Sequence, residues 1–146
     1  MLKRYLVITL FLFVLIECLG PNEVTLEFRI AEDEPATGLT EMIFEMTGES
    51  FYLHKEVLVD QSNIDTAIVT TQNKRPAILL VLTREGTRKF AELTQRNVGK
   101  RCAMILNGEL VSAPRIMAPI VEGRAILAGN FTESEANRIA EELSRQ

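Results

Sequence analysis

The chain has 146 residues, of which 47% are hydrophobic and 25% charged, and its net charge at pH 7 is −4. This length and composition indicate one compact globular domain and exclude two large ones. The negative charge argues against nucleic acid as a partner, because binding to phosphates relies on a basic surface.

The first twenty residues differ in character from the rest of the chain. Lys3 and Arg4 precede an uncharged apolar run at residues 5–16. A basic start followed by such a run is typical of a secretory signal, and the run is shorter than the roughly 20 apolar residues of a membrane-spanning helix. We therefore expect residues 1–20 to be a signal peptide or a short membrane anchor, and residues 21–146 to form the exported domain.

The two cysteines have separate roles in this interpretation. Cys18 is a candidate lipidation site, although Glu17 occupies the position where a bacterial lipoprotein signal has a small residue. An uncleaved anchor and atypical cleavage are the alternatives. Cys102 lies in an apolar stretch and is expected to be a small buried hydrophobic residue, so we expect no internal disulfide.

Four segments follow in the first half of the exported part. Alternating apolar residues predict a half-buried strand at residues 22–30. Residues 31–38 are acidic and contain proline and glycine, which predicts a surface loop without the oxygen spacing of a calcium site. Residues 42–46 are ambiguous between strand and helix, and residues 51–59 have the composition of a strand.

A hairpin is predicted from residues 64–71 and 76–82, joined by the polar loop 72–75. Pro76 can open the second strand because the first position of a strand tolerates a missing N–H group. The run of residues 78–82 is apolar throughout, which predicts a strand buried on both faces.

A helix is predicted to begin after the N-cap Thr83 and to end before Gly99. Phe90 and Leu93 lie on one side of it. Gly86 weakens the first turn by up to about 1 kcal/mol relative to alanine, so burial of Phe90 and Leu93 has to supply most of the stability.

The strongest local signal is Asn107-Gly108, which follows the apolar run 102–106. Asn-Gly between two apolar runs predicts a hairpin with a type I′ turn, because both residues tolerate positive φ. The run is apolar on both faces, so we expect a central strand with a helix covering one face.

The last part of the chain predicts two more strands and a helix. Pro114 and Pro119 limit how far a strand at residues 115–120 can pair, and residues 125–128 form a further strand. Thr132 and Glu135 form a capping box with Phe131 as hydrophobic staple. The apolar face of the helix is Ala136, Ile139, Ala140 and Leu143. Hairpins with intervening helices predict an α+β domain with a largely antiparallel sheet and helices packed on one face.

Several segments together resemble a known family. These are YLHKE at residues 52–56, the run 82–101, LNGELVSAPRI at 106–116 and EGRAILAGNFTESEA at 122–136. They resemble the head subdomain of the first periplasmic domain of SecD, in the SecDF protein-export family. In SecD that domain precedes a bundle of transmembrane helices which, with SecF, couples proton flow to export.

The resemblance implies a non-enzymatic binding module, free-standing or tethered to the membrane through its N-terminal segment. It would face the periplasm and contact exported polypeptides or components of the Sec translocon. It could do so by offering an open strand edge to an extended segment. The alternative is an envelope lipoprotein with a different protein partner, unrelated to translocation.

Enzymatic activity is the least favoured hypothesis. His54 is the only histidine, Ser112 is not in a nucleophile elbow, and the carboxylates Glu32 and Asp33 lie in the predicted acidic loop. No phosphate-binding or dinucleotide-binding glycine motif is present. We expect no catalytic, metal or cofactor site and no small-molecule substrate.

Overall fold

The computed structural model describes residues 23–145. The predicted signal peptide or anchor at residues 1–20, with its candidate lipidation site Cys18, lies outside the described residues. Within the described residues no helix is long and apolar enough to span a membrane.

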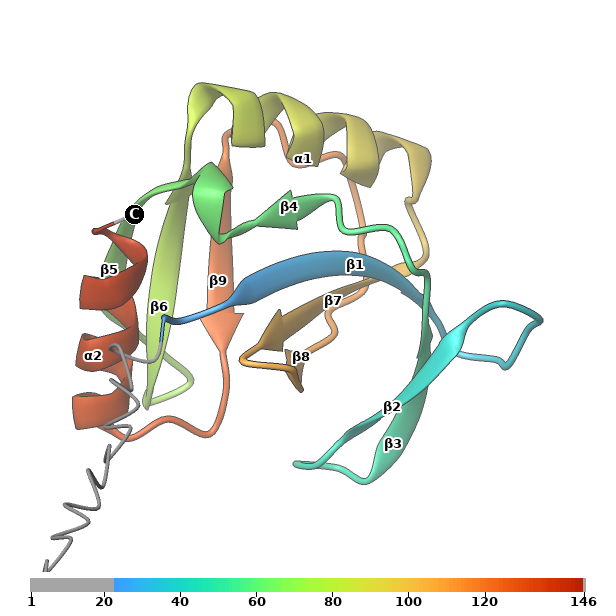
Figure 1. Cartoon of the computed structure of the whole chain (residues 1–146), viewed down its shortest axis with the longest axis horizontal. Coiled ribbons are helices and arrows are strands. Elements are labelled where there is room, and N and C mark those ends of the chain that lie inside the picture. Colours follow the sequence, from blue (N-terminus) through green and yellow to red (C-terminus); the bar gives the residue numbers. More distant parts are fainter. Residues whose placement is uncertain (1–22, 146) are drawn as a thin grey trace, which may run out of the picture.

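The larger of two sheets has the strand order β2-β3-β1-β7-β8, and the short strand β4 pairs with β1 (Figure 1). Every pairing in it is antiparallel. Its strands are β1 (Leu26–Glu32), β2 (Thr40–Phe44), β3 (Glu49–Leu53), β4 (Val59–Asp60), β7 (Arg101–Leu106) and β8 (Glu109–Ser112).

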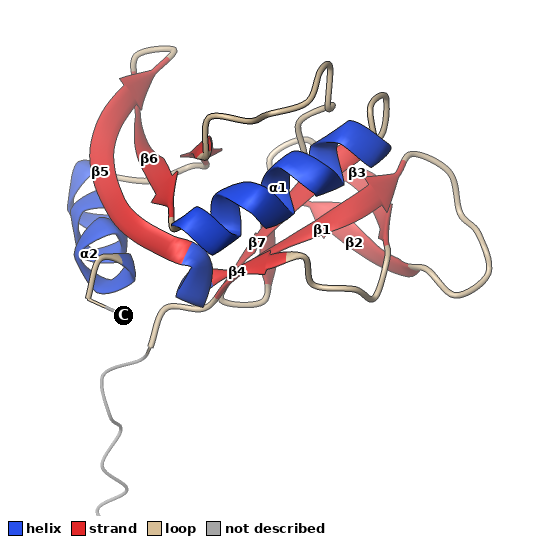
Figure 2. Cartoon of the chain, turned by 90° about the horizontal axis from the view of Figure 1, so that it is seen from above, coloured by secondary structure: helices blue, strands red, loops and turns tan. Residues whose placement is uncertain are grey.

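The smaller sheet has the order β5-β6-β9, again antiparallel, with β5 (Ile64–Gln72), β6 (Arg75–Leu82) and β9 (Arg124–Ala128). A short 3-10 helix, η1 (Gln61–Asn63), leads from β4 into it. Helix α2 (Glu133–Leu143) packs on β5 and β6, and α1 (Arg84–Arg96) runs along the large sheet (Figure 2). The expected α+β class is confirmed, although the strands divide into two sheets.

The Asn-Gly hairpin is confirmed. Asn107 and Gly108 have φ values of 50° and 83°, as a type I′ turn requires, and Leu106 pairs with Glu109. Alternate residues of β7 contribute to two cores on opposite faces of the sheet. The main core includes Phe90 of α1, whose ring meets that of Phe28 edge-on at 5.5 Å, and the second core is closed mainly by β3 and β8. The predicted central strand covered on both faces is therefore confirmed.

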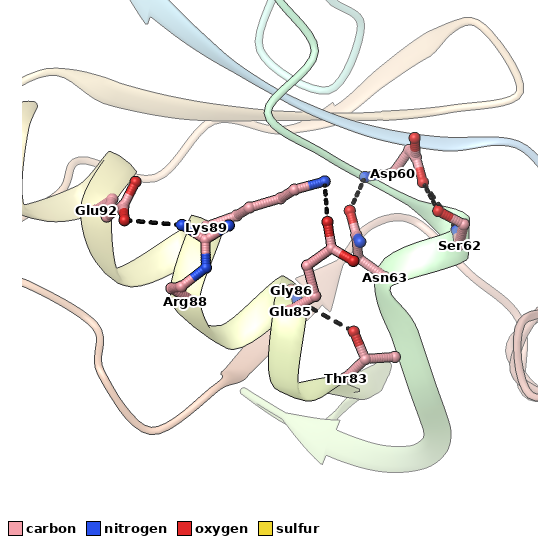
Figure 3. Close-up of polar contacts among 9 residues, drawn as sticks. All are labelled: Asp60, Ser62, Asn63, Thr83, Glu85, Gly86, Arg88, Lys89 and Glu92. Carbon is pink, nitrogen blue, oxygen red and sulfur yellow. Dashed lines mark hydrogen bonds and ion pairs between the residues drawn. The ribbon is translucent and has the colours of Figure 1, made fainter.

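Helix α1 begins as predicted, and Figure 3 shows the hydrogen bond between Thr83 and Gly86 in its first turn. Thr83 Oγ1 accepts from Gly86 N at 3.0 Å, and Thr83 N donates to the buried Asn63 carbonyl at 2.8 Å. A Cβ on Gly86 would lie 2.7 Å from that carbonyl oxygen. Gly86 therefore allows a close approach between α1 and η1.

Helix α2 also begins as predicted. Glu135 N donates to Thr132 Oγ1 at 3.2 Å, and Thr132 N donates to Glu135 Oε2 at 2.8 Å, which completes the capping box. These hydrogen bonds lower the pKa of Glu135. All four residues of the predicted apolar face are buried.

Two predictions for the first half are wrong in their boundaries. Ala31 and Glu32 belong to β1 and not to the acidic loop, because Ala31 is fully buried and pairs with Leu53 and Arg101. The strand expected at residues 51–59 ends at Leu53. The ambiguous patch at residues 42–46 is mainly strand, in β2.

Two predictions for the second half are corrected as well. Residues 115–120 form no strand: Arg115 alone makes a single bridge, to Arg101, while Pro114 precedes the segment and Pro119 lies within it. Strand β6 is fully buried on one face only. Leu79 and Val81 on its other face are half-buried, because an open pocket lies in front of this part of the small sheet.

Candidate functional site

An apolar pocket lies between the small sheet and the irregular segment 113–123, and we call it the β9 pocket. Its volume is about 650 Å³, within the usual range for ligand-binding clefts. One wall is Leu79 of β6 and Ile126 of β9, which are cross-strand partners and therefore lie on the same face. Phe90 and Met104, both buried, contribute to its lining from α1 and β7.

The second wall, residues 113–123, is held in place without being a strand. Ile116 exchanges two backbone hydrogen bonds of 2.8 Å with Gly99 and Lys100, and Ile120 N donates to Thr94 Oγ1 at 2.8 Å. Between these two anchors Met117 is 79% exposed. The segment therefore presents an apolar side chain at the mouth of the pocket.

Strand β9 borders the β9 pocket with an unpaired edge. Leu82 N donates to Gly123 O at 2.9 Å, which makes these two residues a hydrogen-bonded pair of the β6-β9 ladder. In an antiparallel ladder the hydrogen-bonded residues alternate, so the backbone groups of Arg124, Ile126 and Ala128 point away from β6. Within residues 23–145, β9 pairs with no other strand.

The opposite edge of the small sheet is different. Ala67 of β5 donates from its N–H to Ser144 Oγ at 2.9 Å, and Ser144 Oγ donates to the Ala67 carbonyl at 3.3 Å. The residue after α2 thus occupies one edge of the sheet. Of the two edge strands of the small sheet, as described within residues 23–145, β9 is the one that borders the apolar β9 pocket.

The predicted acidic pair lies in an ion-pair cluster and is not simply solvated. Lys100 and His54 both contact Glu32, at 2.8 Å and 2.9 Å, and their hydrogen bonds lower the pKa of Glu32. Asp33 is bound by Arg101 at 2.5 Å and by Arg115 at 2.7 Å, which likewise lower its pKa. The cluster joins the end of β1 to β7 and to the segment 113–123.

The structure does not bring His54 and Ser112 together. Ser112 lines the β9 pocket, whereas His54 contacts Glu32 and lines a separate hollow beside α1. Cys102 is buried as predicted, and burial raises the pKa of its thiol to about 12. No group of three or more metal-binding side chains occurs among residues 23–145.

A second groove runs between strand β2 and the hairpin of β7 and β8, and it reaches the start of α2. It carries four carboxylates along its lining, Glu41, Glu45, Glu109 and Glu135. The β9 pocket is the more apolar of the two hollows, so we take it as the candidate site. The sequence did not predict this pocket, although it predicted the strand that became β9 and indicated that Pro114 and Pro119 limit strand pairing in the preceding segment.

Comparison with known proteins identifies the family. A family model for the SecDF P1 head subdomain matches residues 38–145. The chain is 35% identical over 135 residues to the protein translocase subunit SecDF of Thermus thermophilus, covering 82% of this chain and 18% of that protein. It is 36% identical over 84 residues to SecD of Acidaminococcus fermentans, covering 58% of this chain and 20% of that protein.

Solved structures give the same result. A crystal structure of SecDF in a super-membrane-facing form matches with a TM-score of 0.68 and 26% identity, over 84% of this chain and 19% of that one. A structure of SecDF, described as a membrane component that enhances protein export, matches with a TM-score of 0.67 and 25% identity, over 84% and 62%. The chain spans about a fifth of the length of the curated relatives named above. The resemblance seen in the sequence is confirmed, and the chain belongs to the family of SecDF P1 head subdomains.

Proposed function

We propose that the domain acts in protein export by holding an extended segment of an exported polypeptide. The segment adds as a strand to the free edge of β9 and places an apolar side chain in the β9 pocket. The main observation behind this proposal is that Ile126 lies on the unpaired edge of β9 and also lines the apolar pocket. Main-chain hydrogen bonds then provide affinity for any sequence, and the pocket selects an apolar side chain.

The relatives support this role, since they are translocase subunits and one is described as enhancing protein export. In this proposal the domain faces the periplasm and is a binding module rather than an enzyme. The separation of His54 from Ser112 agrees with a binding role.

The test is crosslinking in cells through a photoreactive residue placed at Met117, at the mouth of the pocket. We expect adducts with newly exported chains. Val98 is the matched control position, because it is 51% exposed and belongs to no part of the β9 pocket. Equal adducts from both positions, or none from Met117, would contradict the proposal.

A proline placed in each of the two edge strands of the small sheet tests strand addition. Ile126→Pro removes an N–H that points away from β6, so it should abolish the Met117 adducts while circular dichroism shows a folded protein. Thr71→Pro is the control, since Thr71 has the same outward orientation on β5 as Ala67. We expect Thr71→Pro to keep the adducts.

We also propose that residues 1–20 hold the domain at the membrane, either as a retained anchor or through lipid on Cys18. Labelling cells with a radioactive lipid precursor tests the second route. Label that disappears in Cys18→Ser would support lipidation, and label that persists in the variant would exclude Cys18 as the modified residue.

A further inference from the structure

The charged side chains that line the β9 pocket are all basic, although the whole chain has 20 acidic and 16 basic residues. They are Arg124, the first residue of β9, and Arg115 on the opposite wall. Arg124 is exposed, and within the described part of the chain it has no ion pair. An acidic group that enters the pocket could therefore bind the Arg124 guanidinium without first breaking an existing ion pair.

Arg115 is fixed in place by its own contacts. It donates to Asp33 at 2.7 Å and to the Gly99 carbonyl at 2.5 Å. Asp33 also binds Arg101, so one carboxylate is shared by two guanidinium groups and an excess of positive charge remains. The pocket therefore combines an apolar interior with a cationic rim.

The register of β9 places these features in a fixed order. Arg124, Ile126 and Ala128 alternate along the strand, share one face, and all line the pocket. A strand that adds to this edge in the antiparallel direction meets Ala128 first, then Ile126, then Arg124. We take this direction because every pairing in both sheets is antiparallel, and antiparallel pairing is slightly more stable.

We infer that the β9 pocket selects extended segments with the order apolar-x-apolar-x-acidic, in which the acidic residue lies opposite Arg124. The small side chain of Ala128 leaves room for a large apolar residue opposite it, and Ile126 offers a second apolar contact. Opposite charges across a strand pair stabilise it, whereas like charges destabilise it. The inference rests on the proposed function, and it adds a preference against basic segments at this site.

The test measures binding of short fluorescent peptides to the full chain by anisotropy, with the same mild detergent in every sample. Three peptides share one apolar-x-apolar frame and differ only in the final position, which is Glu, Gln or Lys. We expect the Glu peptide to bind up to about fivefold more tightly than the Gln peptide, and the Lys peptide more weakly than both. The advantage of the Glu peptide should shrink at high salt.

Variants assign the effect to the strand position. Arg124→Gln should bring the three peptides to similar affinity, and Arg124→Glu should reverse their order. Arg145→Gln is the matched control, because Arg145 is an exposed arginine beyond the end of α2 that does not line the pocket. It should leave the order unchanged.

The outcomes separate the two proposals. Binding of the Gln peptide without any effect of charge would overturn the selectivity and leave the proposed function standing. If a Glu peptide with the reversed residue order bound as tightly as the original Glu peptide, the selectivity would also be overturned, because binding would then not depend on which residue lies opposite Arg124. A failure of all peptides to bind would overturn both.

Discussion

The substitution Gly86→Ala has opposite expected effects on stability. Helix propensity alone predicts that alanine stabilises the protein, whereas the packing around Gly86 predicts that it destabilises the protein. Alanine in place of glycine within a helix is worth up to about 1 kcal/mol of stability. In the structure, a Cβ at this position would lie 2.7 Å from the carbonyl oxygen of Asn63 and 2.9 Å from its Cβ. Asn63 is 5% exposed and its backbone is part of η1, so a side-chain rotation cannot relieve the contact.

Overpacking of a tight site costs about 1–3 kcal/mol. After a helix gain of about 1 kcal/mol is subtracted, we expect Gly86→Ala to lower the free energy of unfolding by up to about 2 kcal/mol. Urea unfolding followed by far-ultraviolet circular dichroism measures this change, with an unchanged m-value as the sign of an unchanged native state. The control is Gln95→Gly at an exposed position of α1, which reports propensity alone and should cost less than about 1 kcal/mol. A Gly86→Ala protein more stable than the parent, as helix propensity alone predicts, would refute the packing argument.

Three further predictions concern a cap, an ion pair and a thiol. Thr132→Ala should lower the free energy of unfolding by about 1 kcal/mol in the same urea assay, because it removes the capping box of α2. Arg101 and Arg115 lower the pKa of Asp33 in the folded state, so the stability it contributes is present above its ordinary pKa of 3.8 and is lost as the pH falls through the lower folded pKa. Unfolding curves of Asp33→Asn should therefore depend less on pH below 4 than those of the parent. In a Cys18→Ser variant, Cys102 should react with a thiol reagent at pH 8 only in urea, because burial raises its pKa to about 12; rapid reaction of this variant in its native state would contradict the prediction.

The elements that the sequence predicted correctly are those specified by neighbouring residues. Asn107-Gly108 determines its own turn through positive φ, and Thr132 with Glu135 determines the start of α2 through reciprocal hydrogen bonds. Thr83 does the same for α1. Each signal spans a few residues, so it can be recognised without knowledge of the rest of the chain.

The elements that the sequence missed depend on partners far away in the chain. Glu32 belongs to β1 because it pairs with Tyr52 of β3 and contacts Lys100, and both partners lie far from it in the sequence. Likewise, the sequence alone indicates only that Gly86 weakens the start of α1, and the reason for a glycine there is the close approach of the Asn63 backbone. The β9 pocket also depends on distant residues, since its walls come from α1, β6, β7 and β9 together.

The contrast between the two edges of the small sheet bears directly on function. An unpaired strand edge favours association with other chains, and proteins commonly cover or interrupt such edges. The edge at β5 is covered by Ser144, which occupies both backbone groups of Ala67. The segment that precedes β9 is hydrogen-bonded at Ile116 and Ile120 to residues outside the small sheet, and within residues 23–145 β9 pairs only with β6, so its other edge is unpaired beside an apolar surface. A domain that covers one edge at Ala67 and leaves the other unpaired beside a pocket has the geometry expected for binding an extended chain, which is why the comparison of Ile126→Pro with Thr71→Pro is decisive.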